Sequence, residues 1–427
     1  MKIVRPYSGF GKLLCSLIYV LCLPLYVLKG KAWKYPRAFE ENPRYMSFKD
    51  ILYFAYKYYF KSSDLPGSER VHQHFKPLGQ PDQYTKLATL SIGGDLMPYA
   101  MLTAQNTQNL WQSVGPDFFA SDLVFANLET PLVRQLPPAF VPEVMLNDMH
   151  FNANEDMLRV FSGNAQFKGY DVLSVCNNHS LDQGVEGLDQ TLSYLEANKI
   201  KAVGARKEEL DQAFTIIECN GIKIGFVAFT FSLNQFERPM DKPWKVNALR
   251  LNTYNCDIQE IVNEVDLCRA AGAEFIICSL HCGNAYQAYP SEQTVDLFER
   301  VFEATGVDII AGSHPHNLQP WTFYEYTSKQ TGQVKKGFAI YSLADFVAYD
   351  IYTWCHLCAY LKIELYKDEA GQLQFWPIVK PLIMQNQNNA LQLQYAEVVL
   401  QQAPLSAEVK DIKVLYDICM QPFKPRS

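Results

Sequence analysis

The chain contains seven short, almost purely apolar segments, separated by stretches in which apolar residues recur at helical spacing. Apolar runs of this length are typical of β-strands that are covered on both faces of a sheet. We therefore predict strands at 87–93, 122–126, 171–176, 222–230, 273–280, 307–311 and 338–343.

Amphipathic helices are predicted between these strands. The segment 184–198 keeps its leucines on one helical face, and 291–304 has Ser291 as an N-cap and Gly306 as its stop. This alternation of strands and helices indicates an α/β domain. The final 60 residues are polar and rich in Gln, and they show no obvious cluster of metal ligands.

The beginning of the chain differs from the body. Residues 13–28 carry no charge, but they are fewer than the roughly 20 that a membrane-spanning helix needs, and Pro24 interrupts them. We expect residues 1–35 to associate with a membrane, either spanning it or lying in its interface; a buried helix of the body is the alternative. Residues 36–86 are predicted to form a helical lead-in, with an aromatic stretch at 48–60.

The charges support this division of the 427-residue chain. The first 39 residues carry seven basic side chains and no acidic one, whereas the remainder carries 31 basic and 45 acidic residues. The basic head suits an anionic membrane surface, and the acidic body excludes general nucleic-acid binding. By the positive-inside rule, the basic residues that flank the apolar segment favour a body on the cytoplasmic side.

The eleven cysteines show no disulfide framework, so we expect reduced and mostly buried thiols. Cys355 and Cys358 form a C-x-x-C pair, but no second pair completes a structural zinc site. We interpret this pair as incidental.

Polar side chains follow five of the predicted strands. They are Asp95, Asn127 to Glu129, Asn177 to His179, His281, and the pair His314 and His316. Sites in α/β proteins form beyond the carboxyl ends of strands, so these groups are expected to converge. Imidazole, carboxylate and carboxamide together suit Mn, Fe or Zn, as one or two divalent ions. Such an ion would activate water, and His179 could protonate a leaving oxygen.

Six segments resemble the CapA family of capsule and poly-γ-glutamate biosynthesis proteins. They are GGDLMP (93–98), LVFANLETPL (123–132), DVLSVCNNHSLDQGVEGLDQTLSYL (171–195), SLHCGNAYQAYPSEQ (279–293), IIAGSHPHNLQPW (309–321) and AIYSLADFV (339–347). The resemblance implies the fold of calcineurin-like metallophosphoesterases, an α/β sandwich of two mixed sheets flanked by helices. It places that domain at 87–365, with a C-terminal extension at 366–427 packed on it.

The resemblance also implies roles for individual residues. His179 resembles the catalytic histidine and Asp95 the first metal-binding aspartate, which is also implicated in catalysis. Asn127, Asn177 and Asp182 are predicted to contact the substrate. The expected metal ligands are Asp95, Glu129 as a bridging carboxylate, Asn178, His281, His314 and His316.

Several positions depart from these patterns. Met97 stands where the superfamily usually has a histidine, and Asn127 to Glu129 replace its Gly-Asp block. Cys282 and Ala285 occupy positions where the family often has Trp and Glu, and Ala344-Asp345 replaces Gly-Asn. Because of these differences, the number of bound metal ions can differ from that of the superfamily, and the substrate can differ from that of other family members.

Two functions follow from the sequence. One is a membrane-associated, metal-dependent hydrolase or transferase with a phosphoesterase-type site, acting on a phosphoester or an anionic polymer. The other is a non-catalytic component of polymer synthesis or export that binds a metal or a polyanion. Other capsule-synthesis proteins are expected partners in both cases.

Overall fold

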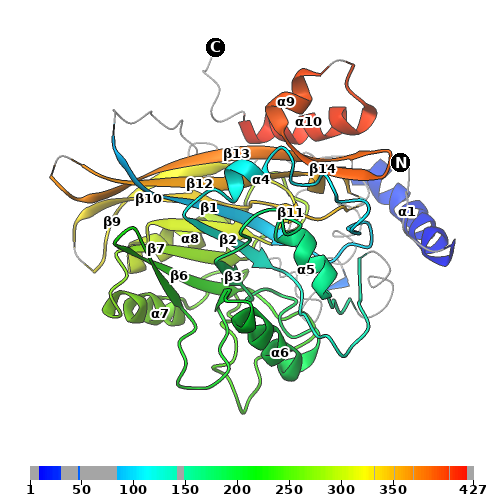
Figure 1. Cartoon of the computed structure of the whole chain (residues 1–427). Helices are drawn as coiled ribbons and strands as arrows, with labels where there is room; N and C mark the ends of the chain where they lie inside the picture. Colours follow the sequence, from blue (N-terminus) through cyan, green and yellow to red (C-terminus); the bar gives the residue numbers. More distant parts are fainter. Residues whose placement is uncertain are drawn as a thin grey trace.

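The computed structural model describes residues 9–29, 47–48, 84–141, 149–330, 332–350, 352–368, 370–402 and 404–420. Its centre consists of two mixed β-sheets that face each other, with helices on the outside (Figure 1). The predicted α/β sandwich is thereby confirmed, and each predicted apolar run forms a strand.

The first sheet has eight strands in the order β14-β13-β12-β1-β2-β3-β4, and β11 pairs with β1 outside this order. Strands β1 to β4 run parallel, β12 is antiparallel to β1, and β13 and β14 are each antiparallel to the strand before them. The strands are β1 (Lys86–Leu96), β2 (Leu123–Leu128), β3 (Val172–Ser174), β4 (Lys201–Val203), β11 (Asp345–Val347), β12 (Leu357–Lys367), β13 (Leu373–Gln387) and β14 (Ala390–Tyr395).

The second sheet has six strands in the order β5-β6-β7-β8-β10-β9, with a parallel centre from β6 to β10. Its two edge strands, β5 and β9, are antiparallel to their neighbours. The strands are β5 (Thr215–Cys219), β6 (Ile222–Thr230), β7 (Phe275–His281), β8 (Ile309–Ser313), β9 (Trp321–Thr327) and β10 (Val334–Ile340).

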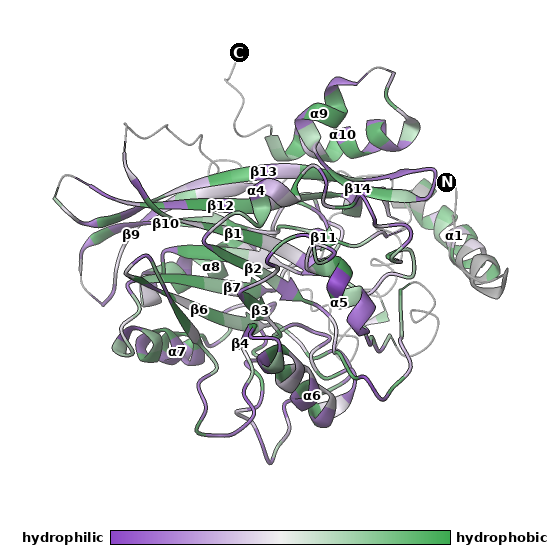
Figure 2. Ribbon diagram, viewed as in Figure 1, coloured by the Kyte–Doolittle hydropathy of each residue, from purple (hydrophilic) through white to green (hydrophobic). Residues whose placement is uncertain are grey.

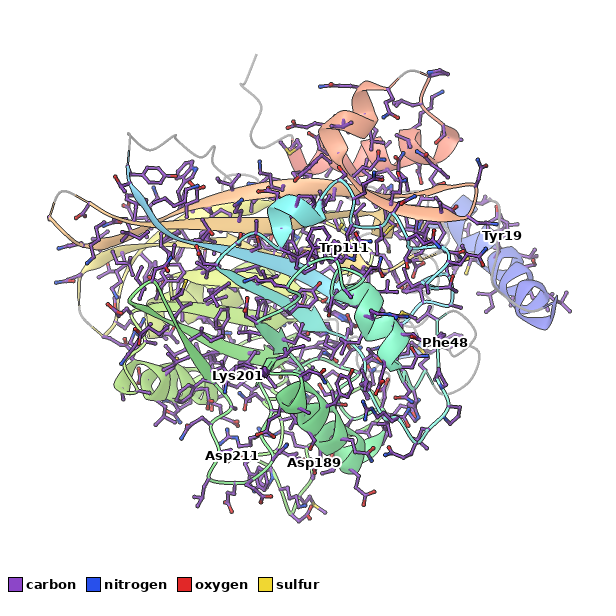
Figure 3. All side chains as sticks on the ribbon, in the orientation of Figure 1. Tyr19, Phe48, Trp111, Asp189, Lys201 and Asp211 are labelled. Atoms are coloured by element: carbon purple, nitrogen blue, oxygen red, sulfur yellow. The ribbon has the colours of Figure 1, made fainter. Side chains whose placement is uncertain are left out.

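The helices cover the outside of this sandwich. Ser291 caps α8 by accepting a hydrogen bond from the backbone N–H of Thr294, and Gly306 ends it at φ +63°, as predicted. Trp111, labelled in Figure 3, donates from Nε1 to the carbonyl of Val160 in α5 at 2.7 Å. The helices are α1 (Gly9–Lys29), α4 (Gly115–Phe118), α5 (Glu155–Phe161), α6 (Gly184–Ala197), α7 (Gln259–Ala270), α8 (Glu292–Thr305), the 3-10 turn η2 (Thr353–His356), α9 (Ala396–Gln401) and α10 (Ala407–Met420).

Aromatic side chains fill the space between the two sheets. The rings of Phe125 and Phe226 stack with their centroids 5.4 Å apart, and Phe275 meets Phe375 edge-on at 5.4 Å. Figure 2 shows the strands largely green and the outer helices α5 and α6 partly purple. Burial of this apolar surface stabilises the sandwich and fixes the relative position of the strand ends.

The C-terminal residues continue the first sheet. The expected boundary between 365 and 366 falls inside β12, and the Gln-rich segment that follows supplies β13 and β14. Helices α9 and α10 then lie against β13 and η2 (Figure 1). Figure 1 also shows α1 at the opposite end of the molecule from α7.

Among the side chains of α1 whose burial is described, Cys22 is buried, whereas several apolar ones, including Leu17 and Leu21, are exposed. No helix in the described ranges is both long and apolar enough to cross a membrane. Most of the predicted lead-in at 36–86 lies outside the described residues.

Candidate metal centre

The carboxyl ends of strands from both sheets meet at one place. Asp95 lies near the end of β1, and His281 is the last residue of β7. Ser313 ends β8 and is followed directly by His314. Because the neighbouring strands are parallel, their carboxyl ends reach the same edge of each sheet.

Two glycines let the backbones approach closely at this edge. A Cβ atom on Gly94 would lie 2.1 Å from the carbonyl oxygen of Ala344, and one on Gly312 would lie 2.1 Å from that of Tyr341. The backbone N–H of Asp95 donates to the carbonyl of Ala344 at 2.9 Å. Only glycine permits such contacts, so these positions let the segment between β10 and β11 pack closely against the ends of β1 and β8.

Asp95 is fully buried and held by two donors. Its Oδ1 accepts from Nδ2 of Asn127 at 2.7 Å, and its Oδ2 accepts from the backbone N–H of His314 at 3.0 Å. Burial raises the pKa of Asp95, whereas the hydrogen bond from Asn127 and the nearby His316 and His314 lower it. These contacts fix the carboxylate between the ends of β1, β2 and β8.

Glu129 is completely buried, and neither of its carboxylate oxygens accepts a hydrogen bond from a described donor. Oε1 lies 3.6 Å from Nε2 of His281. Burial and the neighbouring Asp95 carboxylate raise the pKa of Glu129 well above its ordinary value. A buried carboxylate without donors is costly, so this position favours a cation.

His281 is oriented by neighbours on both sides of its ring. Nε2 lies 2.8 Å from Oδ1 of Asn178, and Nδ1 lies 2.9 Å from Oγ of Ser313. Burial, together with His314, His316 and His179, lowers the pKa of His281 well below its ordinary value. The ring is therefore neutral, the form in which imidazole binds metals.

His316 pairs with Asp345, which stands where the family usually has Asn. Nδ1 of His316 lies 2.9 Å from Oδ1 of Asp345. Burial opposes a charge on His316, but Asp345, Glu129 and Asp95 raise its pKa above the ordinary value. His314 and His316 have φ of 93° and 62°, a strained conformation that clusters at functional sites.

These side chains form two groups that share one residue. In the first group, ligand atoms of Glu129, His281 and His314 lie within 4.8 Å of one another. In the second, those of Asp95, Glu129 and His316 do so. Asn178 adjoins the first group through its contact with His281. Glu129 therefore lies where a carboxylate that bridges two ions would be expected.

His179 lies beside these groups and is locked in place. Nδ1 is 2.6 Å from Oδ2 of Asp182, and the ring stacks on Phe151 with a centroid distance of 3.8 Å. The backbone N–H of Phe151 donates to the same Oδ2 at 2.7 Å. Asn177 accepts from the backbone N–H of His179 at 3.1 Å, which fixes the turn.

The structure thus brings all six predicted metal ligands together in one site, with five of them buried and His316 partly exposed. His179 lies close enough to influence the pKa of His281. The three residues predicted to contact substrate, Asn127, Asn177 and Asp182, are also buried here. Their hydrogen bonds go to Asp95, to the carbonyl of Leu128 and to His179, respectively.

Two residues that support the site, Ser313 and Asn234, were not among those predicted from the sequence. Ser313, which contacts His281, stands in the quoted segment next to His314 and could have been included from that position. Asn234 accepts from Nδ2 of Asn178 at 3.0 Å and lies outside every quoted segment. Three residues that depart from the family and superfamily patterns are buried, namely Met97, Cys282 and Ala285. Burial raises the pKa of the Cys282 thiol.

The geometry defines a class of protein: an α/β two-sheet sandwich with a buried cluster of metal-binding residue types at its strand ends. The family model described as bacterial capsule synthesis protein PGA_cap matches residues 89–350. The chain belongs to this family, and the expected relationship is confirmed.

Two relatives of this chain carry the CapA name. The PGA biosynthesis protein CapA of Bacillus subtilis (strain 168) is 26% identical over 279 residues, which cover 64% of this chain and 66% of the relative. The capsule biosynthesis protein CapA of Bacillus anthracis is 24% identical over 269 residues, covering 61% and 59%. The chain thus spans less than two thirds of the length of each relative.

Among solved structures, the chain is similar to the calcineurin-like phosphoesterase YfkN from Bacillus subtilis. That match has a TM-score of 0.36 at 15% identity and covers 80% of this chain and 100% of the other. A similarity of this size carries no functional argument.

Proposed function

We propose that this protein is a metal-dependent hydrolase or transferase of phosphoester type that acts in capsule or poly-γ-glutamate biosynthesis. The observation that carries the proposal is the pair of ligand groups that share Glu129, with His179 and Asp182 beside them. The family and the names of the two relatives support the biological setting.

The residues fit one or two divalent ions. Glu129 offers two buried carboxylate oxygens without donors, and neutral His281 offers Nε2 next to Oδ1 of Asn178. This mixture of oxygen and imidazole ligands suits Mn, Fe or Zn. When bound, such an ion would polarise a phosphoryl oxygen and activate water at neutral pH.

The chain's own residues would position and protonate the substrate. Asp182 accepts a hydrogen bond from Nδ1–H of His179, which leaves Nε2 as the atom that exchanges a proton with a leaving oxygen. The stacked ring of Phe151 prevents His179 from rotating. Asn127 and Asn177 act indirectly, because their amides hold Asp95 and the end of β2 in place.

The test is metal content together with phosphodiesterase activity of the full chain. Wild type is compared with the double variant His314→Ala/His316→Ala and with His150→Ala, whose residue belongs to neither ligand group. We expect bound metal and metal-dependent hydrolysis of bis-p-nitrophenyl phosphate in wild type and His150→Ala. In the double variant we expect loss of the hydrolysis and of the metal bound by the two groups that share Glu129. Absence of metal after reconstitution with Mn, Fe or Zn would overturn the proposal.

The second candidate is a non-catalytic component that binds a metal or polyanion during polymer synthesis or export. Met97, where the superfamily usually has a histidine, favours it because that position supplies no nitrogen ligand. A polyanion on this acidic chain would need a bound cation between them. This candidate predicts that the His314/His316 double variant still supports polymer production in cells, whereas removal of residues 1–35 abolishes it.

For both candidates we propose that the protein is associated with the cell envelope through α1. The exposed apolar residues Leu13, Leu17, Val20 and Leu21 follow the spacing of one helical face, while Cys22 faces the body. The seven basic residues of the first 39 would add attraction to anionic lipids. A helix of this kind lies in the membrane interface with its apolar face in the lipid.

A further inference from the structure

A third group of metal-binding residue types lies outside the two groups that share Glu129. One ligand atom each from Asp345, Asp350 and Cys355 lies within 4.8 Å of the others, and all three residues are buried. In the sequence, Cys355 stands out only as half of a C-x-x-C pair. The other half, Cys358, lies in β12 and does not belong to this group.

The fold holds this group firmly. Asp345 begins β11 in register with Asp95, and Cys355 lies in η2. Asp350 Oδ1 accepts from the backbone N–H of Tyr352 at 2.7 Å, and its Oδ2 accepts from the hydroxyl of Tyr99. The three residues therefore come from a short segment that folds back on itself after β11.

A second observation points to a ligand at this position. Oδ2 of Asp345 is buried and has no hydrogen-bond partner among the described residues, while its Oδ1 faces His316. Two carboxylates and a thiol are thus buried together, where an uncompensated charge is unfavourable. A bound cation would satisfy the open oxygen and neutralise the carboxylates.

We propose that Asp345, Asp350 and Cys355 form a third cation site, adjoining the other two through the contact of Asp345 with His316. A thiolate combined with two carboxylates suits a borderline ion, and we assign Zn²⁺ as its occupant. Binding would form a bond from Sγ of Cys355 to the ion and release the thiol proton to the solvent. The inference goes beyond the proposed function, since the site can bind zinc whether or not the protein is an enzyme.

Cobalt(II) is a suitable probe because it takes the place of zinc and a cobalt–thiolate bond absorbs strongly in the near ultraviolet. Metal-free full-length protein is titrated with Co²⁺, alongside Cys355→Ser, Cys358→Ser and Asp350→Asn. We expect a saturable absorption band in wild type and Cys358→Ser, and none in Cys355→Ser. In Asp350→Asn, we expect at least a tenfold weaker affinity for the absorbing site. Zinc should displace the band.

The double variant His314→Ala/His316→Ala separates this inference from the proposed function. If the two groups around Glu129 bind no metal but the band persists, the third site stands alone. A wild type that shows no band at saturating Co²⁺, or a band that survives Cys355→Ser, would overturn the inference. Circular dichroism of each variant establishes that loss of the band is not loss of folding.

Discussion

Asp182 Oδ2 lies 2.6 Å from Nδ1 of His179 and also accepts the backbone N–H of Phe151, the residue whose ring stacks on that histidine. One carboxylate oxygen therefore fixes both the imidazole and the segment that covers it. Since Asp182 follows His179 by three residues in the same turn, the unit is local. Its placement beside the ligand groups, however, depends on the packing of both sheets.

This unit gives the first prediction. Asp182→Asn keeps the shape of the side chain but removes the charge that orients Nδ1–H of His179. If His179 transfers a proton, hydrolysis of bis-p-nitrophenyl phosphate should fall by about 10²-fold. Metal content should stay unchanged, because Asp182 belongs to neither ligand group. Asp156→Asn, an exposed residue of α5, serves as the matched control. A variant with normal turnover would remove His179 from the mechanism.

The second prediction concerns the buried carboxylate of Glu129. Burial raises the pKa of Glu129 well above its ordinary value, so folding of the metal-free protein must either protonate this carboxyl or bury its charge without a described donor. Glu129→Gln removes that cost, so the metal-free protein should become more stable by about 1–2 kcal/mol. The same change should weaken metal binding, because both ligand groups use this residue. Urea unfolding with and without added metal measures both effects. A metal-free variant less stable than wild type would contradict this account of Glu129.

A third prediction uses Asp308, which directly precedes β8, at the opposite end of that strand from His314. Burial raises the pKa of Asp308 to about 6, although the N–H of Ile276 and the nearby Arg269 and Lys335 oppose the shift. The unfolded carboxyl loses its proton near pH 4, so between about pH 4 and 6 the folded protein binds more protons. The free energy of unfolding should therefore fall as the pH rises through this window.

Asp308→Asn should remove that dependence, since the amide oxygen can still accept from Ile276. Between about pH 4 and pH 7, the free energy of unfolding of the variant should rise relative to that of wild type by at most ~2 kcal/mol. This upper limit allows for solvent screening, because Asp308 is partly exposed. Urea unfolding of both proteins at both pH values measures this difference in stability. Parallel pH profiles for the two proteins would show that Asp308 does not cause the effect.

The fourth prediction concerns α1. Leu17 and Leu21 are 53% and 74% exposed and lie one turn apart. Leu17→Glu/Leu21→Glu should reduce co-sedimentation with vesicles containing anionic phosphatidylglycerol at least tenfold, because two apolar contacts are replaced by charges that the lipid repels. Leu210→Glu is the control, since Leu210 is exposed on another part of the molecule. Equal binding by the double variant and wild type would rule out this face as the membrane contact.

Much of the fold could be predicted because its signals are local. Continuous apolar runs such as 222–230 form strands wherever a sheet can bury them, and Ser291 and Gly306 limit α8 through their own backbone preferences. The Gln-rich segment gave no such signal. Its residues become β13 because β12 offers a free edge, a property of the assembled sheet and not of the segment.

The candidate site shows the same division. The sequence alone determined that Asp95, His281 and His314 stand at strand ends, because a strand's end is a local property. Only the tertiary structure decided that Glu129 is shared between two groups and that Asp345 meets both His316 and Cys355. Those relationships depend on the register of β11 with β1 and on the stacking of the two sheets, which distant parts of the chain determine together.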